Sequence, residues 1–162
     1  MKRTFIALAP ALLAGCQSVG PGITDPASAS QSPCASPEAR QEVSETIRAF
    51  FAALAVDDHA AVQRLTTANF YAYEIGKRYT GPALSKLIAD AHAAGRILQW
   101  NIGSIDARID CHMASAVWEN TGASGTAAKM EPRAWLESAV LLRQGNRWVI
   151  DFLHSTPKDP RP

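Results

Sequence analysis

The sequence lacks an excess of charge of either sign. Of its 162 residues, 16 are Lys or Arg and 15 are Asp or Glu, which gives a formal net charge of +1 at pH 7. Proteins that bind nucleic acids usually carry a basic excess or a basic stripe, so we expect no nucleic-acid partner. Apolar residues make up 47% of the chain, and this length suffices for one globular domain but not for two.

Several catalytic and metal-binding motifs are also missing. The sequence contains no His-Glu-x-x-His and no Cys-x-x-Cys, so we expect no metal ion and no other cofactor. It has no Gly-x-Ser-x-Gly turn, which argues against a serine hydrolase. Lys129 follows the glycines of the loop at 122–125 too late to complete a phosphate-binding loop.

The first sixteen residues have the pattern of a targeting segment. Lys2 and Arg3 precede an apolar run at 5–14, which is too short to span a bilayer. The run ends in Leu13-Ala14-Gly15-Cys16, which resembles the lipobox of bacterial lipoproteins. In that family the peptide is cleaved before the cysteine, whose thiol then carries lipid. The resemblance implies a signal peptide over 1–15 and lipidation of Cys16; an ordinary secretory signal with an accidental cysteine is the alternative.

The segment after the lipobox is predicted to be a flexible tether. Residues 16–35 are mainly Ser, Ala, Pro and Gly, which cannot bury enough apolar surface to order themselves. Removal of Lys2 and Arg3 leaves 14 basic against 15 acidic residues, so lipid rather than charge would hold the chain to the membrane. Gln17 replaces the Asp that retains enterobacterial lipoproteins in the inner membrane. We therefore expect a periplasm-facing envelope protein, with the outer membrane favoured.

Two cysteines remain once Cys16 is assigned to the lipid. Cys34 and Cys111 would lie in an oxidising compartment, where a disulfide can form. Such a bridge would fasten the start of the first helix to a strand. The alternative is two unpaired thiols, one in a mobile segment and one buried as a small apolar residue.

Residues 36–156 are predicted to fold as one domain, followed by a tail at 157–162. Ser36-Pro37-Glu38 has the cap, proline and acid of a helix start, and Asp58 is placed to cap a short second helix. A hairpin turning at Gly76-Lys77 precedes a third helix that ends at Gly95. Strands are expected at about 98–110, 112–120, 133–143 and 147–155. Helices followed by long antiparallel strands indicate an α+β fold, with a curved sheet covered by helices on one face.

This order of elements resembles the nuclear transport factor 2-like fold, in particular small bacterial SnoaL-like domains of unknown function. The residues that carry the resemblance are YEIGKRYTG (73–81), WENTG (118–122), WLESAVL (135–141) and WVIDFLHST (148–156). The resemblance implies a cone with a pocket between sheet and helices, and a homodimer through the open sheet face. It does not imply a reaction, because this fold contains cyclases, isomerases, dehydratases and non-enzymes.

The register of the last two strands can be derived from their turn. Gly145-Asn146 suits a tight hairpin, and if Gln144 pairs with Arg147, then Glu137 lies opposite His154. Strand alternation then predicts one face that carries Trp135, Glu137, Ala139, Leu141, Trp148, Ile150, Phe152 and His154. The other face would be apolar enough for a second subunit, through Leu136, Val140, Leu142, Val149 and Leu153. A one-residue bulge would instead place Glu137 and His154 on opposite faces.

Glu137 and His154 are the candidate catalytic residues. A carboxylate opposite an imidazole would hold the ring in one tautomer and raise its pKa, which suits a general acid or base in an apolar cone. The alternative is a structural ion pair that closes the end of the sheet. Candidate ligand-binding residues are Tyr73, Trp118, Asn120 and Trp135, and we expect two of Tyr71, Tyr73 and Tyr79 to point inward. For the aromatic residues, an ordinary core position is the alternative.

Three functions remain open at this point. The first is an envelope lipoprotein that binds a small, partly apolar molecule in its cone. The second is an isomerase, cyclase or lyase with His154 as base and Glu137 orienting it. The third is a structural or accessory lipoprotein whose pocket is filled by its own side chains.

Overall fold

A computed structural model of the chain describes residues 34–158. The described residues all belong to one compact unit, Gln31–Pro162. This unit contains every helix, strand and core residue given below, and residues 31–162 are therefore used in the experiments proposed. The predicted signal peptide, Cys16, most of the tether and most of the tail lie outside the described residues.

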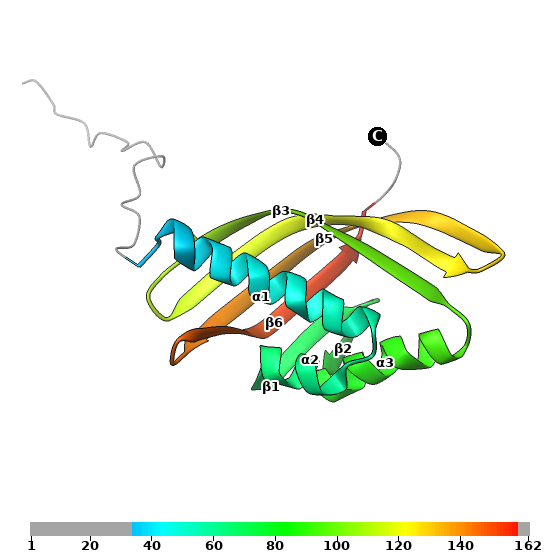
Figure 1. Cartoon of the computed structure of the whole chain (residues 1–162), viewed down its shortest axis with the longest axis horizontal. Helices are drawn as coiled ribbons and strands as arrows, with labels where there is room; N and C mark the ends of the chain where they lie inside the picture. The colour runs from blue at the N-terminus through cyan, green and yellow to red at the C-terminus, as the bar shows by residue number, and fades with distance from the viewer. Residues whose placement is uncertain (1–33, 159–162) are drawn as a thin grey trace, which may run out of the picture. The chain divides into compact units, whose positions relative to one another are not determined.

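Three helices form where the sequence predicts them, within the described part of the chain. They are α1 (Pro37–Ala55), α2 (His59–Leu65) and α3 (Gly81–Ala93). The backbone N–H of Ala39 donates to the Ser36 side chain, and that of Ala61 donates to Asp58, so both predicted caps are confirmed. All three helices lie against one face of the sheet (Figure 1). None of them is long and apolar enough to cross a membrane.

Six strands complete the described fold. They are β1 (Thr66–Glu74), β2 (Lys77–Thr80), β3 (Ile97–Ile109), β4 (Met113–Thr126), β5 (Lys129–Gln144) and β6 (Arg147–Pro157). They form one sheet in the order β2-β1-β6-β5-β4-β3, in which β1 and β6 run parallel and the other neighbours antiparallel. The predicted α+β class, a curved sheet covered by helices, is confirmed. The β1–β2 turn is at Ile75-Gly76, one residue earlier than predicted, because Glu74 pairs with Lys77.

The core fills the space between the helices and the inner face of the sheet, which we define as the face toward α1–α3. Helix α1 contributes its predicted stripe of Val43, Ile47, Phe50, Phe51 and Leu54, and the sheet contributes small and branched residues between them. Phe51 packs edge-on against Trp100 and Trp118. This aromatic contact joins the middle of α1 to β3 and β4, beside the candidate site.

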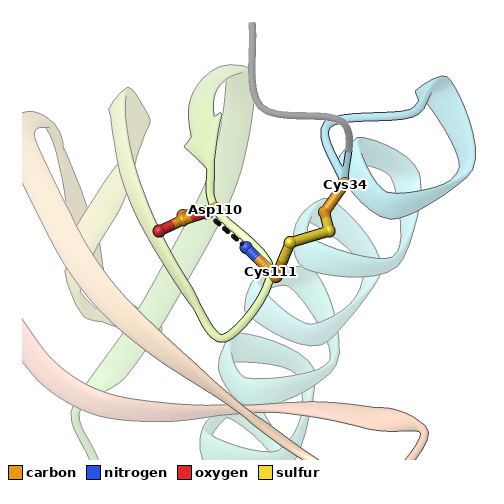
Figure 2. The surroundings of a disulfide bond; sticks show 3 residues. All are labelled: Cys34, Asp110 and Cys111. Atoms are coloured by element: carbon orange, nitrogen blue, oxygen red, sulfur yellow. Dashed lines mark hydrogen bonds between the residues drawn. A yellow bond between two sulfur atoms is a disulfide. The ribbon is translucent and has the colours of Figure 1, made fainter.

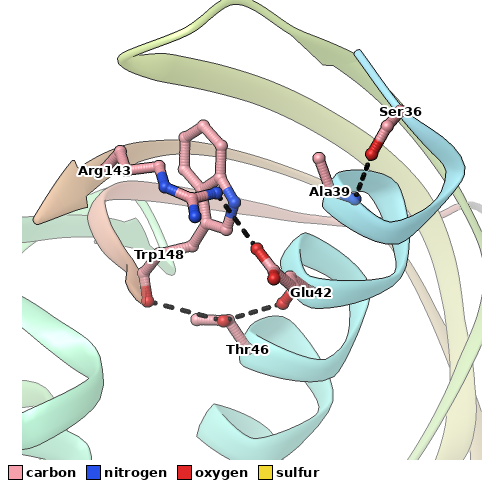
Figure 3. Close-up of polar contacts among 6 residues, drawn as sticks. All are labelled: Ser36, Ala39, Glu42, Thr46, Arg143 and Trp148. Atoms are coloured by element: carbon pink, nitrogen blue, oxygen red, sulfur yellow. Dashed lines mark hydrogen bonds and ion pairs between the residues drawn. The ribbon is translucent and has the colours of Figure 1, made fainter. Parts of the chain in front are cut away.

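Polar contacts fasten α1 both to β3 and to the strands on either side of the β5–β6 turn. Arg48 donates to the backbone oxygens of Ile102 and Gly103, where the register of β3 shifts and the strand bends. At the other side, Arg143 pairs with Glu42 at 3.1 Å, and Thr46 donates to the backbone oxygen of Trp148 (Figure 3). The helix is therefore fastened across the concave sheet rather than resting on apolar contacts alone.

A disulfide joins the start of α1 to the β3–β4 turn. Cys34 and Cys111 are bonded, with their Cα atoms 5.0 Å apart and a sequence separation of 77 (Figure 2). The backbone N–H of Cys111 donates to Asp110, which orders the turn that carries it. The bridge therefore connects the residues directly before α1 to the turn that leads out of the edge strand β3.

The derived register of β5 and β6 is correct near the turn and wrong beyond it. Gln144 pairs with Arg147 and Leu141 with Ile150, as derived, but Val140 pairs with Phe152. Asp151 is the extra residue of a bulge, and Thr67 donates a hydrogen bond to its carboxylate at 2.6 Å. From this point on, every β6 side chain lies on the opposite face from the one predicted. Leu153 is therefore in the core and not on the predicted open face, whereas Val149 keeps its predicted face but is buried.

Candidate functional site

One row of inner-face residues crosses four neighbouring strands. Glu137 on β5 pairs with Ser155 on β6 and with Trp118 on β4. On the other side of β6, Tyr73 pairs with His154, which places Glu74 on β1 alongside Ser155. The row therefore reads Glu74, Ser155, Glu137, Trp118, and it lies under the helices.

Two nitrogen donors hold the Glu137 carboxyl. Trp118 Nε1 donates to Glu137 Oε2 at 2.6 Å, and Asn120 Nδ2 donates to the same oxygen at 3.1 Å. The carbonyl oxygen of the Asn120 side chain accepts from the backbone N–H of Asn101, which orients the amide with its nitrogen toward Glu137. Asn120 is fully buried and Glu137 is 5% exposed. The carboxyl is thus fixed in position and nearly removed from water.

The environment raises the pKa of Glu137 to about 7 from its ordinary value of 4.5. Burial is the main cause, because it disfavours the charged form, and the charge of Glu74 adds to it. The hydrogen bonds from Asn120, Trp118 and Ser155 act in the opposite direction, since they stabilise the carboxylate. Glu137 is therefore close to half protonated at neutral pH.

Aromatic and aliphatic side chains share the inner side of the domain with this polar row. Trp135 lies on the inner face beside Asn120, and Trp100, Tyr79, Leu87 and Ile88 are half-buried against the core. Trp118, Asn120, Trp135 and Glu137, all predicted as site residues, are thus brought together on one face.

His154 is on the outer face, away from the helices, and does not meet Glu137. The bulge at Asp151 pairs it with Ser138, so the predicted Glu137–His154 pair is wrong. His154 is exposed and packs near the Tyr73 ring at a centroid distance of 6.1 Å. Because its ring is on the opposite face of the sheet from Glu137, it cannot have the role derived from the sequence.

Tyr73 also lies on the outer face, together with Tyr71. Their rings contact each other and Phe152, and the Arg78 guanidinium lies 4.2 Å from the centre of the Tyr71 ring. Only Tyr79 among these three tyrosines faces the core, so the expectation that two of them point inward is wrong. Tyr73 is separated by the sheet from the other predicted ligand-binding residues.

Glu74 and Ser155 belong to the site but were not assigned to it from the sequence. Strand alternation through Phe70 and Ala72 places Glu74 on the inner face, which could have identified it. Ser155 could not be identified in this way, because its face depends on the bulge. Both residues lie next to predicted ones, Tyr73 and His154, whose faces were assigned wrongly.

Other polar groups in residues 34–158 form separate contacts. His92 pairs with Asp57 at 2.9 Å, and His59 hydrogen-bonds to Ser85. No group of three or more His, Cys, Asp or Glu side chains in this part of the chain is arranged to hold a metal ion. A cavity of about 610 Å³ lies at the start of β1 and α3, and one of about 320 Å³ lies between α1, α2 and the β5–β6 turn; neither is lined by Glu137.

Comparisons with known proteins support the fold but assign no activity. The sequence matches no protein-family model and no curated protein. Solved structures similar to it include a ketosteroid isomerase-like protein from Erwinia carotovora atroseptica, with a TM-score of 0.63, 14% identity, and coverage of 77% of this chain and 100% of that one. A nuclear transport factor 2-like protein with a cystatin-like fold from Novosphingobium aromaticivorans has a TM-score of 0.65 and 16% identity, over 76% of this chain and 84% of that one.

A third similar structure is a dehydratase-like protein of the nuclear transport factor 2-like family from Streptomyces avermitilis. It has a TM-score of 0.65 and 14% identity, and the match covers 76% of this chain and 99% of that one. The nuclear transport factor 2-like fold expected from the sequence is therefore confirmed. At these identities the likeness shows the fold alone, so the function must be argued from the residues of this chain.

Proposed function

We propose that this domain binds a small, partly apolar molecule beside Glu137 and carries out acid/base chemistry on it, of the isomerase, cyclase or lyase type. The observation that carries the proposal is the Glu137 carboxyl itself. It is held by two nitrogen donors, nearly removed from water, and has a pKa of about 7. Buried carboxyls with a raised pKa cluster at functional sites, where they act as general acids or bases.

The chemistry follows from the protonation state of Glu137. Near pH 7 both forms are populated, so the same oxygen atoms can remove a proton from a bound molecule and return it elsewhere. The Trp118 and Asn120 donors stabilise the carboxylate after a proton is given up, and burial favours the acid when the proton is held. Isomerisation and elimination both require such a reversible transfer.

The surroundings define the kind of molecule. Trp100, Trp118 and Trp135 present apolar rings on the inner face near the acid. These rings favour a molecule with an apolar body and one polar group that reaches Glu137. The similar isomerase-like and dehydratase-like structures support this reading by analogy of fold.

The test compares two Glu→Gln variants of residues 31–162. Glu137→Gln keeps the size and an acceptor oxygen but cannot exchange a proton. Glu119→Gln makes the same change on β4, where Glu119 pairs with Lys158 on the protein surface. Each protein is incubated with a bacterial metabolite extract, and substrates and products are followed by mass spectrometry.

We expect one compound to be converted by the wild type and by Glu119→Gln, and about 10²- to 10⁴-fold more slowly by Glu137→Gln. A compound that copurifies unchanged with all three proteins would identify a carrier and contradict the acid/base step. If nothing is bound or converted, the binding proposal itself fails, and the structural alternative remains.

We further propose that the chain is a lipoprotein of the cell envelope, anchored through Cys16 and facing the periplasm. The lipobox resemblance of Leu13-Ala14-Gly15-Cys16 supports this location. The Cys34–Cys111 disulfide supports it independently, because disulfides persist mainly in oxidising compartments.

The anchor is tested by expressing the full chain in a bacterium and separating membranes from soluble protein. We expect Cys16→Ser to move the protein from the membrane to the soluble fraction, and Ser18→Ala to leave it in the membrane. Retention of Cys16→Ser in the membrane fraction would rule out a lipid on Cys16 as the anchor.

A further inference from the structure

Glu137 needs a way to exchange its proton with water, because its carboxyl is almost completely enclosed. Ser155 and Glu74 lie next to it on the same face of the sheet, on β6 and β1. Ser155 lies between the Glu74 and Glu137 carboxyls on this face, and its hydroxyl lowers the pKa of each as a hydrogen-bond donor. A continuous chain of polar groups therefore connects Glu137 to Glu74.

Glu74 is the end of this chain that reaches solvent. It is half-buried at the last position of β1, directly before the Ile75-Gly76 turn. Ile75 is 69% exposed and has a φ of 51°, a left-handed conformation that a β-branched residue rarely adopts. The turn thus holds the strained Ile75 at the surface. Glu74, which directly precedes Ile75, therefore has its carboxyl at the edge of the enclosed site.

We propose that Ser155 and Glu74 relay the proton of Glu137 to and from water. In the outward step, the Glu137 carboxyl gives its proton to Ser155 Oγ while the Ser155 hydroxyl proton passes to a carboxylate oxygen of Glu74. One O–H bond breaks and one forms at Ser155, which ends neutral, and Glu74 then releases the proton to water. The relay rests on the acid/base role proposed above, and makes Glu74 and Ser155 positioning and transfer groups for it.

The other titratable groups nearby are outside the relay. Lys77 lies opposite Glu74 on β2, next to the turn. On β5, Arg133 is engaged with Glu131 and Ser124, and on α3, His92 is paired with Asp57. His154 flanks Ser155 on β6 but points to the other face. Burial raises the pKa of Glu74, and hydrogen bonds from Ser155 and the backbone of Ile75 act in the opposite direction, so Ser155 is the side chain that couples to it.

The first test measures the titration of Glu137 by ¹³C NMR of the carboxyl carbons in residues 31–162. We expect Glu74→Gln to lower the pKa of Glu137, because a like charge is removed. We expect Ser155→Ala to raise it, because a hydrogen bond to the carboxylate is lost. Ser138→Ala is the matched control, since Ser138 is on the outer face of β5 opposite His154, and it should change nothing.

The second test separates transfer from simple coupling. With the converted compound identified above, Ser155→Ala should slow turnover about tenfold or more, and added formate should restore it by carrying the proton in place of the relay. A Ser155→Ala rate that equals the wild type overturns the relay and leaves the role of Glu137 standing. A Glu137→Gln rate that equals the wild type overturns the acid/base function, whatever the relay variants do. Opposite NMR shifts without formate rescue show coupling only and reject the transfer step.

Discussion

Burial of Glu137 lowers the free energy of unfolding, and other interactions in the domain must offset this loss. In an unfolded chain the carboxyl ionises with a pKa near 4.5, whereas in the folded protein its pKa is about 7. The folded state therefore holds a proton that the unfolded state has lost over this pH range. Natural proteins keep such destabilising groups mainly where a function requires them, which agrees with a role for this acid in the site.

This difference predicts that the domain loses stability as pH rises from about 5 to 8. Because the folded state binds more protons than the unfolded state between pH 4.5 and 7, the free energy of unfolding falls through this window and is level above it. The contribution of Glu137 is roughly 3 kcal/mol, at about 1.4 kcal/mol per pKa unit. Urea unfolding of the wild type and of Glu137→Gln at several pH values measures it.

The difference between the two proteins isolates Glu137 from all other groups. We expect Glu137→Gln to gain in stability relative to the wild type as pH rises from 5 to 8, whereas Glu119→Gln should follow the wild type throughout. A constant difference between Glu137→Gln and wild type over this range would mean that the carboxyl is ionised in the folded protein at pH 5.

At the scale of elements, the sequence was sufficient for the helices and for most of the strands. The caps at Ser36 and Asp58 and the stripe of α1 follow from local chemistry, and the structure has them. The β5–β6 turn was also derived correctly, because Gly145 adopts a φ of 62° that suits it. These features depend on neighbours a few residues away, which sequence patterns record.

The bulge at Asp151 could not be predicted from β6 alone. Val149, Ile150, Phe152 and Leu153 are all apolar, so both faces of the strand fit a core, and alternation cannot choose between them. The Thr67 side chain that bonds to Asp151 comes from the parallel neighbour β1, 84 residues earlier. The candidate site was therefore predicted only in part. Glu137, Trp118 and Asn120 were grouped correctly. The bulge, which a contact distant in sequence stabilises, places Ser155 instead of His154 beside Glu137.

At the scale of the whole domain, the two faces of the sheet differ in what covers them. The inner face is closed by α1–α3 over the core and the polar row. The outer face keeps large apolar side chains in water, including Val117 at 52% exposure and Leu136 at 53%. Phe152 and Tyr73, which the bulge and the β1 register place on this face, extend the same apolar surface. In a monomer these apolar side chains stay in contact with water, whereas a second copy of the chain bound to the outer face would bury them.

We therefore predict a homodimer formed through the outer face. Leu136→Lys should weaken it about tenfold or more, because a lysine buried at the interface without a partner costs more than about 1.4 kcal/mol. The fold should be unaffected, since the Leu136 side chain is about half exposed to water in the single chain.

Val56→Lys is the matched control, because Val56 is 73% exposed in the turn between α1 and α2, away from the sheet. Sedimentation equilibrium of residues 31–162 measures the dissociation constant of each protein. A wild type that sediments as a monomer, or a Leu136→Lys dimer as tight as the Val56→Lys one, would show that the outer face has another use.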